Sequence, residues 1–325
     1  MGLILREDKN FDYCNHKERN FYLFQELAYP FVNFYYQISL SFINCFHKKE
    51  NVSYRYSISL ILIFKNESPF LDEWLCHHMN LGVNHFYFYN NNSTDNYKDT
   101  LSSYIKKGLV TLIDWPEYPG QYSAYRHWYD NFRFESEWVC FLDADEFLCP
   151  MEEIKLQPLL QQYKIYPVIL MYWKLFGTSG VMNHDYNKLV TEQYTVCRDK
   201  LFTEGKIFYN TKFDIDNNLV SMHGFNTRWK IFKIPPINVF KKVVIWNMHK
   251  KSSAIKTPIQ VNHYWSKSYN CWKDKYEKGS IEKGTKWKDF TFFDKLEKKC
   301  ISVDYSIFRF IVDIKLRIKQ EKETN

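Results

Sequence analysis

A regular alternation of apolar runs and helix-forming segments in the first half of the chain constrains the fold most. Residues 57–64 form a near-continuous apolar run with β-branched residues, which is typical of a strand buried on both faces. A polar turn at 65–67, a Ser-Pro start and a stop at Gly82 predict the helix that follows. The same pattern predicts strands at 85–89, 110–114 and 138–142, with helices over 97–107 and 121–134. This alternation predicts an α/β fold with a mostly parallel sheet flanked by helices.

Three polar loops come directly after expected strands, at 65–67, 90–95 and 143–146. Crossovers between parallel strands are almost always right-handed, and ligands collect at the carboxyl ends of such strands. The three loops should therefore meet at one edge of the sheet. We expect the functional site there.

The third loop carries Asp143 and Asp145 immediately after an apolar run. Two nearby carboxylates repel each other, and a hard divalent cation such as Mn²⁺ or Mg²⁺ relieves that repulsion while it binds substrate phosphates. An exposed acidic loop or an ion pair with lysine would explain the same residues, because D-x-D is common. The position at the shared edge favours the cation. It would act as a Lewis acid on a leaving diphosphate, while a general base assists an acceptor hydroxyl.

Five segments, in order along the chain, carry a family resemblance. They are LIFKNESPFLDEWLCHHMNLGVNHFYFYNNNSTD, QYSAYRHW, WVCFLDADEFLCP, WKLFGTSG and QVNHYWSKSYNCWKDKYEKG. Together they resemble glycosyltransferase family 92 and its bacterial relatives over roughly residues 57–313. The resemblance implies a GT-A fold of the family-2-like group, a nucleotide-sugar donor, a divalent cation and an inverting transfer.

The resemblance also implies site residues. Asp143 and Asp145 become the metal and diphosphate site, and a later histidine completes the metal shell, with His263 preferred over His249. For Arg126, a phosphate contact and a plain surface position both stay open. The expected nucleotide-sugar-binding residues are Lys65, Asn66, Glu67, Asn91, Asp95, Gln121, Arg126 and Asp143.

Two positions depart from the family pattern. Asn90 stands where the family usually has aspartate, and this weakens the expectation of a carboxylate at the base or ribose. Val181 stands where the family tends to have histidine, and this leaves the acceptor pocket less defined. An inverting mechanism needs a carboxylate on the acceptor side. Glu192 is the first candidate for this general base and Asp185 the second, although a surface carboxylate explains each equally well.

Other notable side chains have simpler explanations. His77 and His78 are adjacent on an expected helix and point about 100° apart, so we expect them to pack or to face solvent rather than share an ion. Trp173, Trp265 and Trp272 could stack on sugar rings, but tryptophan is more often part of a core. Apolar residues at helical spacing over 301–318 predict a C-terminal amphipathic helix.

Composition bounds the cellular setting. Eight cysteines without a C-x-x-C pair favour reduced thiols, and the N-terminus lacks a signal-peptide layout, so a cytoplasmic location is expected. The uncharged stretch 27–46 allows a membrane span, an interfacial helix or a packed segment, and its polar residues favour the last. With a net charge of +7, peripheral contact with the inner face of the membrane is consistent. No nucleic-acid-binding motif is present, so no nucleic acid partner is expected.

These observations predict three regions: an N-terminal extension at 1–55, a GT-A catalytic domain at 56–270 and a lysine-rich helical region at 271–325. The expected activity is transfer of a hexose from a nucleotide diphosphate sugar to a cell-surface glycan or lipid-linked oligosaccharide, and the resemblance points to a UDP-hexose as the donor. A cation-dependent nucleotidyltransferase and an inactive glycan- or nucleotide-binding module are the alternatives. The polar turn after the first strand lacks the long phosphate loop of nucleotidyltransferases.

Overall fold

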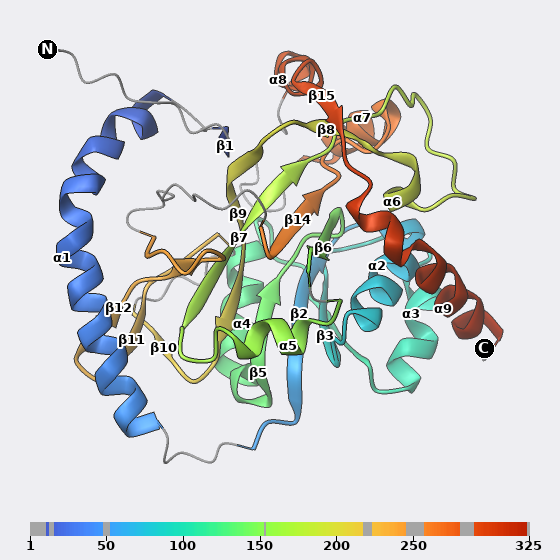
Figure 1. Ribbon diagram of the computed structural model, residues 1–325. Helices are drawn as coiled ribbons and strands as arrows, with labels where there is room; N and C mark the ends of the chain where they lie inside the picture. The colour runs from blue at the N-terminus through green and yellow to red at the C-terminus, as the bar shows by residue number, and fades with distance from the viewer. Residues whose placement is uncertain are drawn as a thin grey trace, which may run out of the picture.

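One large curled sheet organises the protein (Figure 1). The computed structural model describes residues 11–12, 16–47, 53–152, 154–216, 223–244, 257–279 and 289–323. The strand order is β4-β3-β2-β5-β9-β7-β14-β6, with β1 added to β9 and β13 added to β7. These strands are β1 (Phe11–Asp12), β2 (Tyr56–Phe64), β3 (His85–Asn90), β4 (Val110–Asp114), β5 (Ser136–Phe141), β6 (Glu146–Pro150), β7 (Val168–Leu175), β9 (Leu201–Asn210), β13 (Ile237–Asn238) and β14 (Ile259–His263).

The first half of the sheet is entirely parallel, as predicted. Strands β4, β3, β2 and β5 pair side by side, with Ile61 at the centre aligned with Tyr87 on one side and Phe141 on the other. Strand ends align as well, since Phe64 lies opposite Asn90. The loops after β2, β3 and β5 therefore share one edge of the sheet. The α/β fold class with a mostly parallel sheet is confirmed.

The helices of this half cover both faces of the sheet. Trp74 on α2 packs against Phe86 and Phe88, whereas Trp128 on α4 packs against Phe141, which points to the opposite face. Right-handed crossovers produce this arrangement when the strand order reverses between β4 and β5. The helices are α1 (His16–His47), α2 (Ser68–Asn80), α3 (Tyr97–Lys106), α4 (Gln121–Phe132), α5 (Leu156–Gln161), α6 (Val190–Gln193), α7 (Tyr269–Lys278), α8 (Phe290–Glu297) and α9 (Ile311–Glu323), with 3₁₀ turns η1 (Arg133–Glu135) and η2 (Ser306–Phe310).

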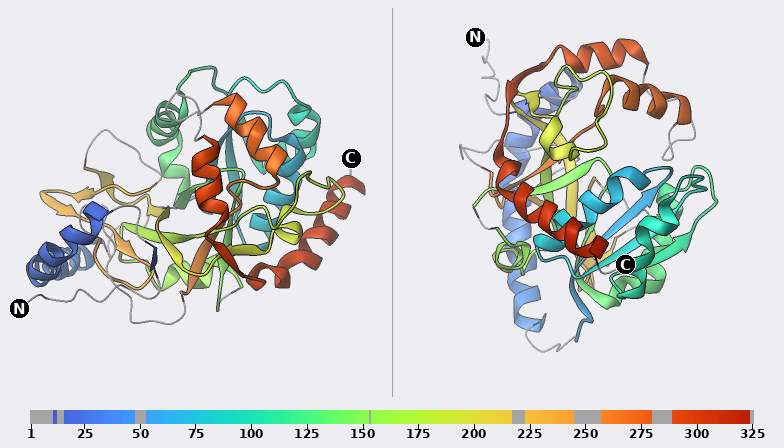
Figure 2. Two further views of the ribbon diagram at one scale, coloured as in Figure 1. Left: turned by 90° about the horizontal axis from the view of Figure 1, so that it is seen from above. Right: turned by 90° about the vertical axis from the view of Figure 1, so that its right-hand side faces the viewer.

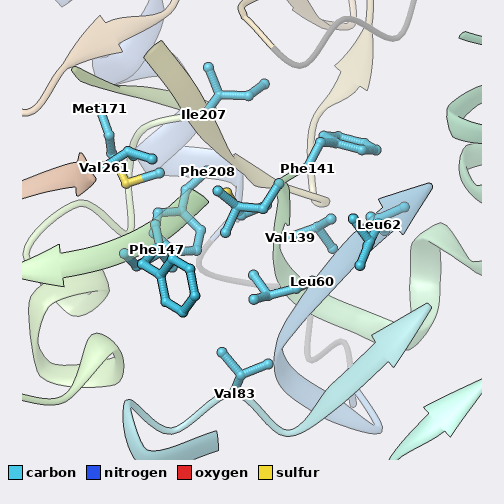
Figure 3. Close-up of a cluster of buried hydrophobic side chains, with 14 of the residues drawn as sticks. Leu60, Leu62, Val83, Val139, Phe141, Phe147, Met171, Ile207, Phe208 and Val261 are labelled. Carbon is cyan, nitrogen blue, oxygen red and sulfur yellow. The ribbon is translucent and has the colours of Figure 1, made fainter. Parts of the chain in front are cut away.

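The second half of the sheet is mixed. Strand β9 runs antiparallel to both β5 and β7, and β6 runs antiparallel to β14. The buried core is nevertheless continuous across the two halves: Leu60 and Val139 of the first lie near Phe147 and Phe208 of the second (Figure 3). Smaller sheets complete the fold: β10 (Asp214–Ile215), β11 (Thr227–Trp229) and β12 (Phe232–Ile234) form one, and β8 (Val196–Arg198) and β15 (Cys300–Val303) form the other.

Two segments outside this core differ from simple expectation. Most of the N-terminal extension forms the single helix α1, which lies beside the β11–β12 hairpin (Figures 1 and 2). Within the described residues, no helix combines the length and apolar character needed to cross a membrane. The helix expected over 301–318 begins only at Ile311, because residues 300–303 pair with β8 and a 3₁₀ turn follows.

Candidate functional site

The turn between β5 and β6 carries the acidic cluster. Strand β5 ends at Phe141, Asp143 and Asp145 occupy the turn, and Glu146 opens β6. The indole Nε1 of Trp74 donates to the carbonyl oxygens of Asp143, at 3.1 Å, and Glu146, at 2.9 Å. The Glu146 carboxylate accepts from the Asp143 amide at 2.9 Å. The turn is therefore fixed by α2 from outside and by its own glutamate from inside.

Asp143 and Glu146 share one buried lysine. The Lys206 Nζ lies 2.8 Å from Asp143 Oδ2 and 3.2 Å from Glu146 Oε2. Lys206 and Glu146 are fully buried, whereas the Asp143 side chain is 36% exposed. Burial opposes the charge on Lys206, but the two carboxylates outweigh it and raise the pKa of its ammonium. Burial raises the pKa of Glu146.

Strand β9 can deliver this lysine because of the residue before it. A Cβ on Gly205 would collide with the backbone of Met171 on β7. The ladder between β7 and β9 shifts register between Tyr172 and Trp173, next to this close approach. A glycine is therefore required where the two strands come together, one position before Lys206.

Asp145 has different partners. Its Oδ2 accepts from the Lys275 Nζ at 2.5 Å, and its Oδ1 lies 3.6 Å from the His263 Nε2. Burial alone would raise the pKa of Asp145, but Lys275, His263 and Lys267 hold it well below its usual range. Burial lowers the pKa of His263 to about 3, so the imidazole is neutral. His263 reaches this position because β14 pairs with β6, which places it opposite Glu146.

Gln121, which we expect to bind the nucleotide sugar, belongs to the same cluster. It is the first residue of α4, and its Nε2 donates to Asp143 Oδ1 at 3.2 Å and to the Tyr125 hydroxyl at 3.1 Å. Trp173 also lies here: its Nε1 donates to Glu146 Oε1 at 2.7 Å, and its ring centre is 4.8 Å from that of His263. Trp173 is buried and hydrogen-bonded in the cluster.

The loops after β2 and β3 are tied together at the same edge. Asn66, in a left-handed conformation with φ of 56°, accepts at Oδ1 from the Thr94 amide at 2.7 Å. Asp95 Oδ2 accepts from the Ser68 amide at 2.8 Å. Glu67 pairs with the Lys267 Nζ at 3.2 Å. Half-buried Lys65 precedes them at the end of β2. These four expected nucleotide-binding residues lie on one pair of joined loops.

Four other predicted residues contact partners outside the acidic cluster, and a fifth lies outside the described residues. The Asn91 amide donates to the carbonyls of Trp115 and Glu117, each at 2.7 Å, and so shapes the loop after β4. Arg126 is partly exposed and pairs with Asp130 one helical turn away. The partner of Glu192 is Lys315, at 2.8 Å, and that of Asp185 is Lys188, at 3.8 Å. His249 lies outside the described residues.

The histidines of α2 are packed, which agrees with the expectation. The His77 Nε2 lies 2.7 Å from the Leu148 carbonyl oxygen. The His78 Nδ1 lies 2.8 Å from the Trp74 carbonyl oxygen, and its Nε2 accepts from the Leu148 amide at 3.3 Å. Both rings connect α2 to β6 and are fully buried.

Sequence reasoning missed the basic partners of the acidic cluster. Lys206 gave one weak signal, since it directly precedes the apolar residues Ile207 and Phe208. Lys267 and Lys275 gave none, because lysine is common throughout the second half of the chain. Glu146 belongs to the acidic run, but the sequence pattern does not indicate that it pairs with a buried lysine.

The donor types present suit Mn²⁺ or Mg²⁺ on chemical grounds. Asp143, Asp145 and His263 offer two carboxylates and an imidazole, and His263 is more than nine-tenths buried with an Nδ1 that has no hydrogen-bond partner. Within the described part of the chain, no three His, Cys, Asp or Glu side chains stand ready to enclose an ion. Lys206 and Lys275 instead neutralise the two aspartates. The residues therefore fit the cation in kind, with ammonium groups as their present partners.

Comparison with known proteins gives a family match. Residues 56–300 match the family model described as glycosyltransferase family 92. A family 92 protein of Oryza sativa subsp. japonica is 33% identical over 147 residues, which are 44% of this chain and 25% of that protein. A Ricinus communis family 92 protein is 25% identical over 226 residues, 68% of this chain and 37% of the relative. The chain thus spans well under half the length of these relatives.

Solved structures give weaker likenesses. S. aureus TarS 1–349 is 15% identical, with a TM-score of 0.34 over 48% of this chain and 47% of that chain. Glucosyl-3-phosphoglycerate synthase from Mycobacterium tuberculosis, in complex with Mn²⁺, UDP and glucosyl-3-phosphoglycerate, is 12% identical, with a TM-score of 0.29 over 48% and 57%. Scores of this size carry no argument about the site.

Proposed function

Because the chain belongs to glycosyltransferase family 92, we propose that it is a metal-dependent inverting glycosyltransferase. It would move a hexose from a nucleotide diphosphate sugar, such as a UDP-hexose, to a cell-surface glycan or lipid-linked oligosaccharide. One observation carries the proposal: Asp143 and Asp145 follow β5 at the sheet edge where the loops after β2 and β3 also meet. Gln121 and His263 are in contact range of those carboxylates.

The residues would divide the work as follows. Lys65, Asn66, Glu67, Asn91 and Asp95 lie on or beside the loops that would hold the nucleotide. Asp143, Asp145 and His263 would hold Mn²⁺ or Mg²⁺. When bound, the cation would stabilise negative charge on the leaving diphosphate. Gln121 would orient Asp143, while Arg126 would have to leave Asp130 before it could meet a phosphate.

The test uses a panel of nucleotide sugars with Mn²⁺, with and without EDTA, and follows slow donor hydrolysis. Hydrolysis of one sugar nucleotide that EDTA stops is expected. Asp145→Asn should lower it at least a hundredfold while the circular dichroism spectrum stays unchanged, because an ion needs the carboxylate. Pyrophosphate release from a nucleoside triphosphate and a sugar phosphate would indicate a nucleotidyltransferase instead. Binding without turnover would indicate an inactive module.

For the general base, we propose Glu192 first and Asp185 second. The Glu192 side chain is 30% exposed and pairs through Oε1 with Lys315, while its buried Oε2 has no hydrogen-bond partner. Glu192→Gln should lower transfer by roughly 10²–10⁴, the usual contribution of a general base. Asp185→Asn is the matched comparison. Full transfer activity in both variants would exclude both residues.

We further propose that the protein docks peripherally on an anionic membrane at the cytoplasmic face. Helix α1 buries one face, with Tyr36 and Leu40, but exposes apolar side chains on the other, including Phe31 at 78% and Phe34 at 68%. The tip of the β11–β12 hairpin adds Ile231 at 88% exposed. Exposed apolar patches of this kind mark interaction sites. The exposed apolar side chains of α1 also include Tyr35, Ile38, Phe42 and Phe46.

A basic residue beside this face would favour lipids with negatively charged headgroups. The Lys230 Nζ lies 4.9 Å from the ring centre of Phe46 and 4.7 Å from that of Trp229, so apolar and cationic groups adjoin. Co-sedimentation with vesicles containing phosphatidylglycerol should exceed that with pure phosphatidylcholine. Phe31→Ser with Phe34→Ser should abolish the difference. Equal binding to both lipids, or dimerisation of the wild type that the double substitution abolishes, would contradict the proposal.

A further inference from the structure

One short segment lays three lysines over the edge of the sheet that carries the acidic cluster. Lys267 precedes the Ser268 cap of α7 and pairs with Glu67. Lys278, at the end of α7, donates to the carbonyl oxygen of Asn66 at 3.4 Å. Between them, Lys275 reaches down to Asp145 at 2.5 Å. The segment therefore contacts both the loop after β2 and the turn after β5.

The contact between Lys275 and Asp145 occupies a position that a cation would need. Both carboxylate oxygens of Asp145 are accounted for, since Oδ2 accepts from Lys275 and Oδ1 faces His263. The Asp145 side chain is 8% exposed, whereas that of Lys275 is 31% exposed. The lysine thus approaches the carboxylate from its solvent side. A cation that enters from solvent to bind Oδ2 has to displace the ammonium.

Besides Asp145, the Lys275 Nζ donates to the carbonyl oxygen of Trp265 at 3.3 Å, a partner without formal charge. Asp143 is already paired with Lys206, and Glu67 with Lys267. A lysine ammonium is a compact, mobile point charge and a frequent phosphate ligand. The diphosphate of a donor held at the same edge would offer it a new partner.

We propose that Lys275 is a diphosphate-binding residue that Asp145 holds in reserve until a divalent cation takes its place. This inference rests on the proposed function, and it makes cation binding and nucleotide binding depend on each other. Without nucleotide, the cation competes with the ammonium and binds weakly. With nucleotide, the ammonium has a second anion, so each ligand strengthens the other.

A merely structural ion pair makes a different prediction. If Lys275 only stabilised α7 and the turn, its loss would weaken the site, and affinities for cation and nucleotide would fall together. Competition followed by diphosphate binding moves the two affinities in opposite directions. This difference in sign makes the inference testable without any measurement of turnover.

The test compares wild type with Lys275→Met, and uses Lys273→Met as control because Lys273 is exposed on the same helix. Isothermal titration measures the affinity for Mn²⁺ alone and the affinity for UDP at saturating Mn²⁺. Loss of one charge-assisted contact corresponds to about tenfold in affinity. Lys275→Met should therefore bind Mn²⁺ about tenfold more tightly and UDP about tenfold more weakly. Lys273→Met should match wild type in both.

Asp145→Asn separates failure of this inference from failure of the proposed function. Mn²⁺ binding that Asp145→Asn abolishes but Lys275→Met leaves unchanged or weakens would overturn the role of Lys275 and leave the cation site standing. Absence of Mn²⁺ binding in wild type and in Lys275→Met, with or without UDP, would overturn both. Mn²⁺ binding seen without UDP only in Lys275→Met would support the inference most strongly.

Discussion

The two halves of the central sheet bring opposite charges to the same place, with Glu146 on β6 as a carboxylate contributed by the mixed half. The parallel half and its loops supply the carboxylates of Glu67, Asp143 and Asp145. The mixed half and the segment after it supply Lys206 from β9, and Lys267 and Lys275 from around α7. Each carboxylate forms an ion pair with one of these lysines. The acidic residues at the end of the parallel strands are therefore only half of the site, because lysines from the other half of the sheet neutralise them.

The burial of the two sets of charges differs as well. Lys206 is fully buried, whereas the Asp143 side chain that it neutralises is 36% exposed. Around Asp145 the order is reversed, since the carboxylate is buried and Lys275 is partly exposed. A buried lysine acts as fixed structure, whereas a partly exposed one is able to exchange partners. The first pair therefore joins the halves and the second is available for ligand exchange.

The largest effect on stability is expected when Lys206, the buried lysine that joins the two halves, is removed. Lys206→Met should cost about 3–5 kcal/mol of unfolding free energy, because it leaves buried Glu146 without its cation. Urea denaturation measures the change. Lys212→Met is the matched control. Lys212 lies just after β9, and its ion pair with Glu137 is partly exposed, so its loss should cost about 0–1 kcal/mol of unfolding free energy.

Equal costs for the two lysine variants would contradict the proposed difference between the pairs. Such a result would mean that solvent reaches Glu146 or that its carboxyl is protonated, so that Lys206 has no compensating role.

The parallel half could be predicted because its signals are local. Each strand is an apolar run followed by polar residues, and Ser68-Pro69 and Gly82 mark the limits of one helix. The mixed half could not be predicted at the same detail. Its strands are antiparallel additions whose order, β9 between β5 and β7, depends on contacts far apart in sequence. The helix predicted over 301–318 was wrong at its start for a similar reason, since residues 300–303 pair with β8, which is far away in the sequence.

The site divides in the same way. The carboxylates of Asp143 and Asp145 and the amide of Gln121 stand next to recognisable strand ends or helix starts. The counter-charges of the two aspartates come from positions 63 and 130 residues later, where nothing in the local pattern distinguishes Lys275 from Lys273. The resemblance to family 92 indicated His263, but not that its neighbour in space is Glu146.

A second test concerns the histidines that connect α2 with β6. Burial lowers the pKa of His77 to about 4, while the unfolded chain has a pKa near 6.5. The unfolded state therefore binds the proton first as pH falls, and stability declines from about pH 6.5 to pH 4. Between pH 7 and pH 4.5, wild type should lose about 2 kcal/mol more than His77→Asn. Parallel pH profiles for the two proteins would contradict this assignment.

The smallest effect concerns the link from α2 to α6. The Glu73 carboxylate accepts from the amides of Val190, at 2.7 Å, and Thr191, at 3.0 Å, and from the Thr191 hydroxyl at 2.7 Å. Glu73→Gln keeps the shape but turns the donor NH₂ of a side-chain amide toward one of these donors, and should cost about 1 kcal/mol of unfolding free energy. Glu192 is on α6, so the same variant should lower transfer only if that carboxylate is the base. Urea denaturation measures the loss of stability in Glu73→Gln. Transfer assays on Glu73→Gln and Glu192→Gln show whether activity depends on the position of the Glu192 carboxylate. A stable, fully active Glu73→Gln variant would mean that the position of α6 does not depend on the hydrogen bonds that the Glu73 carboxylate accepts.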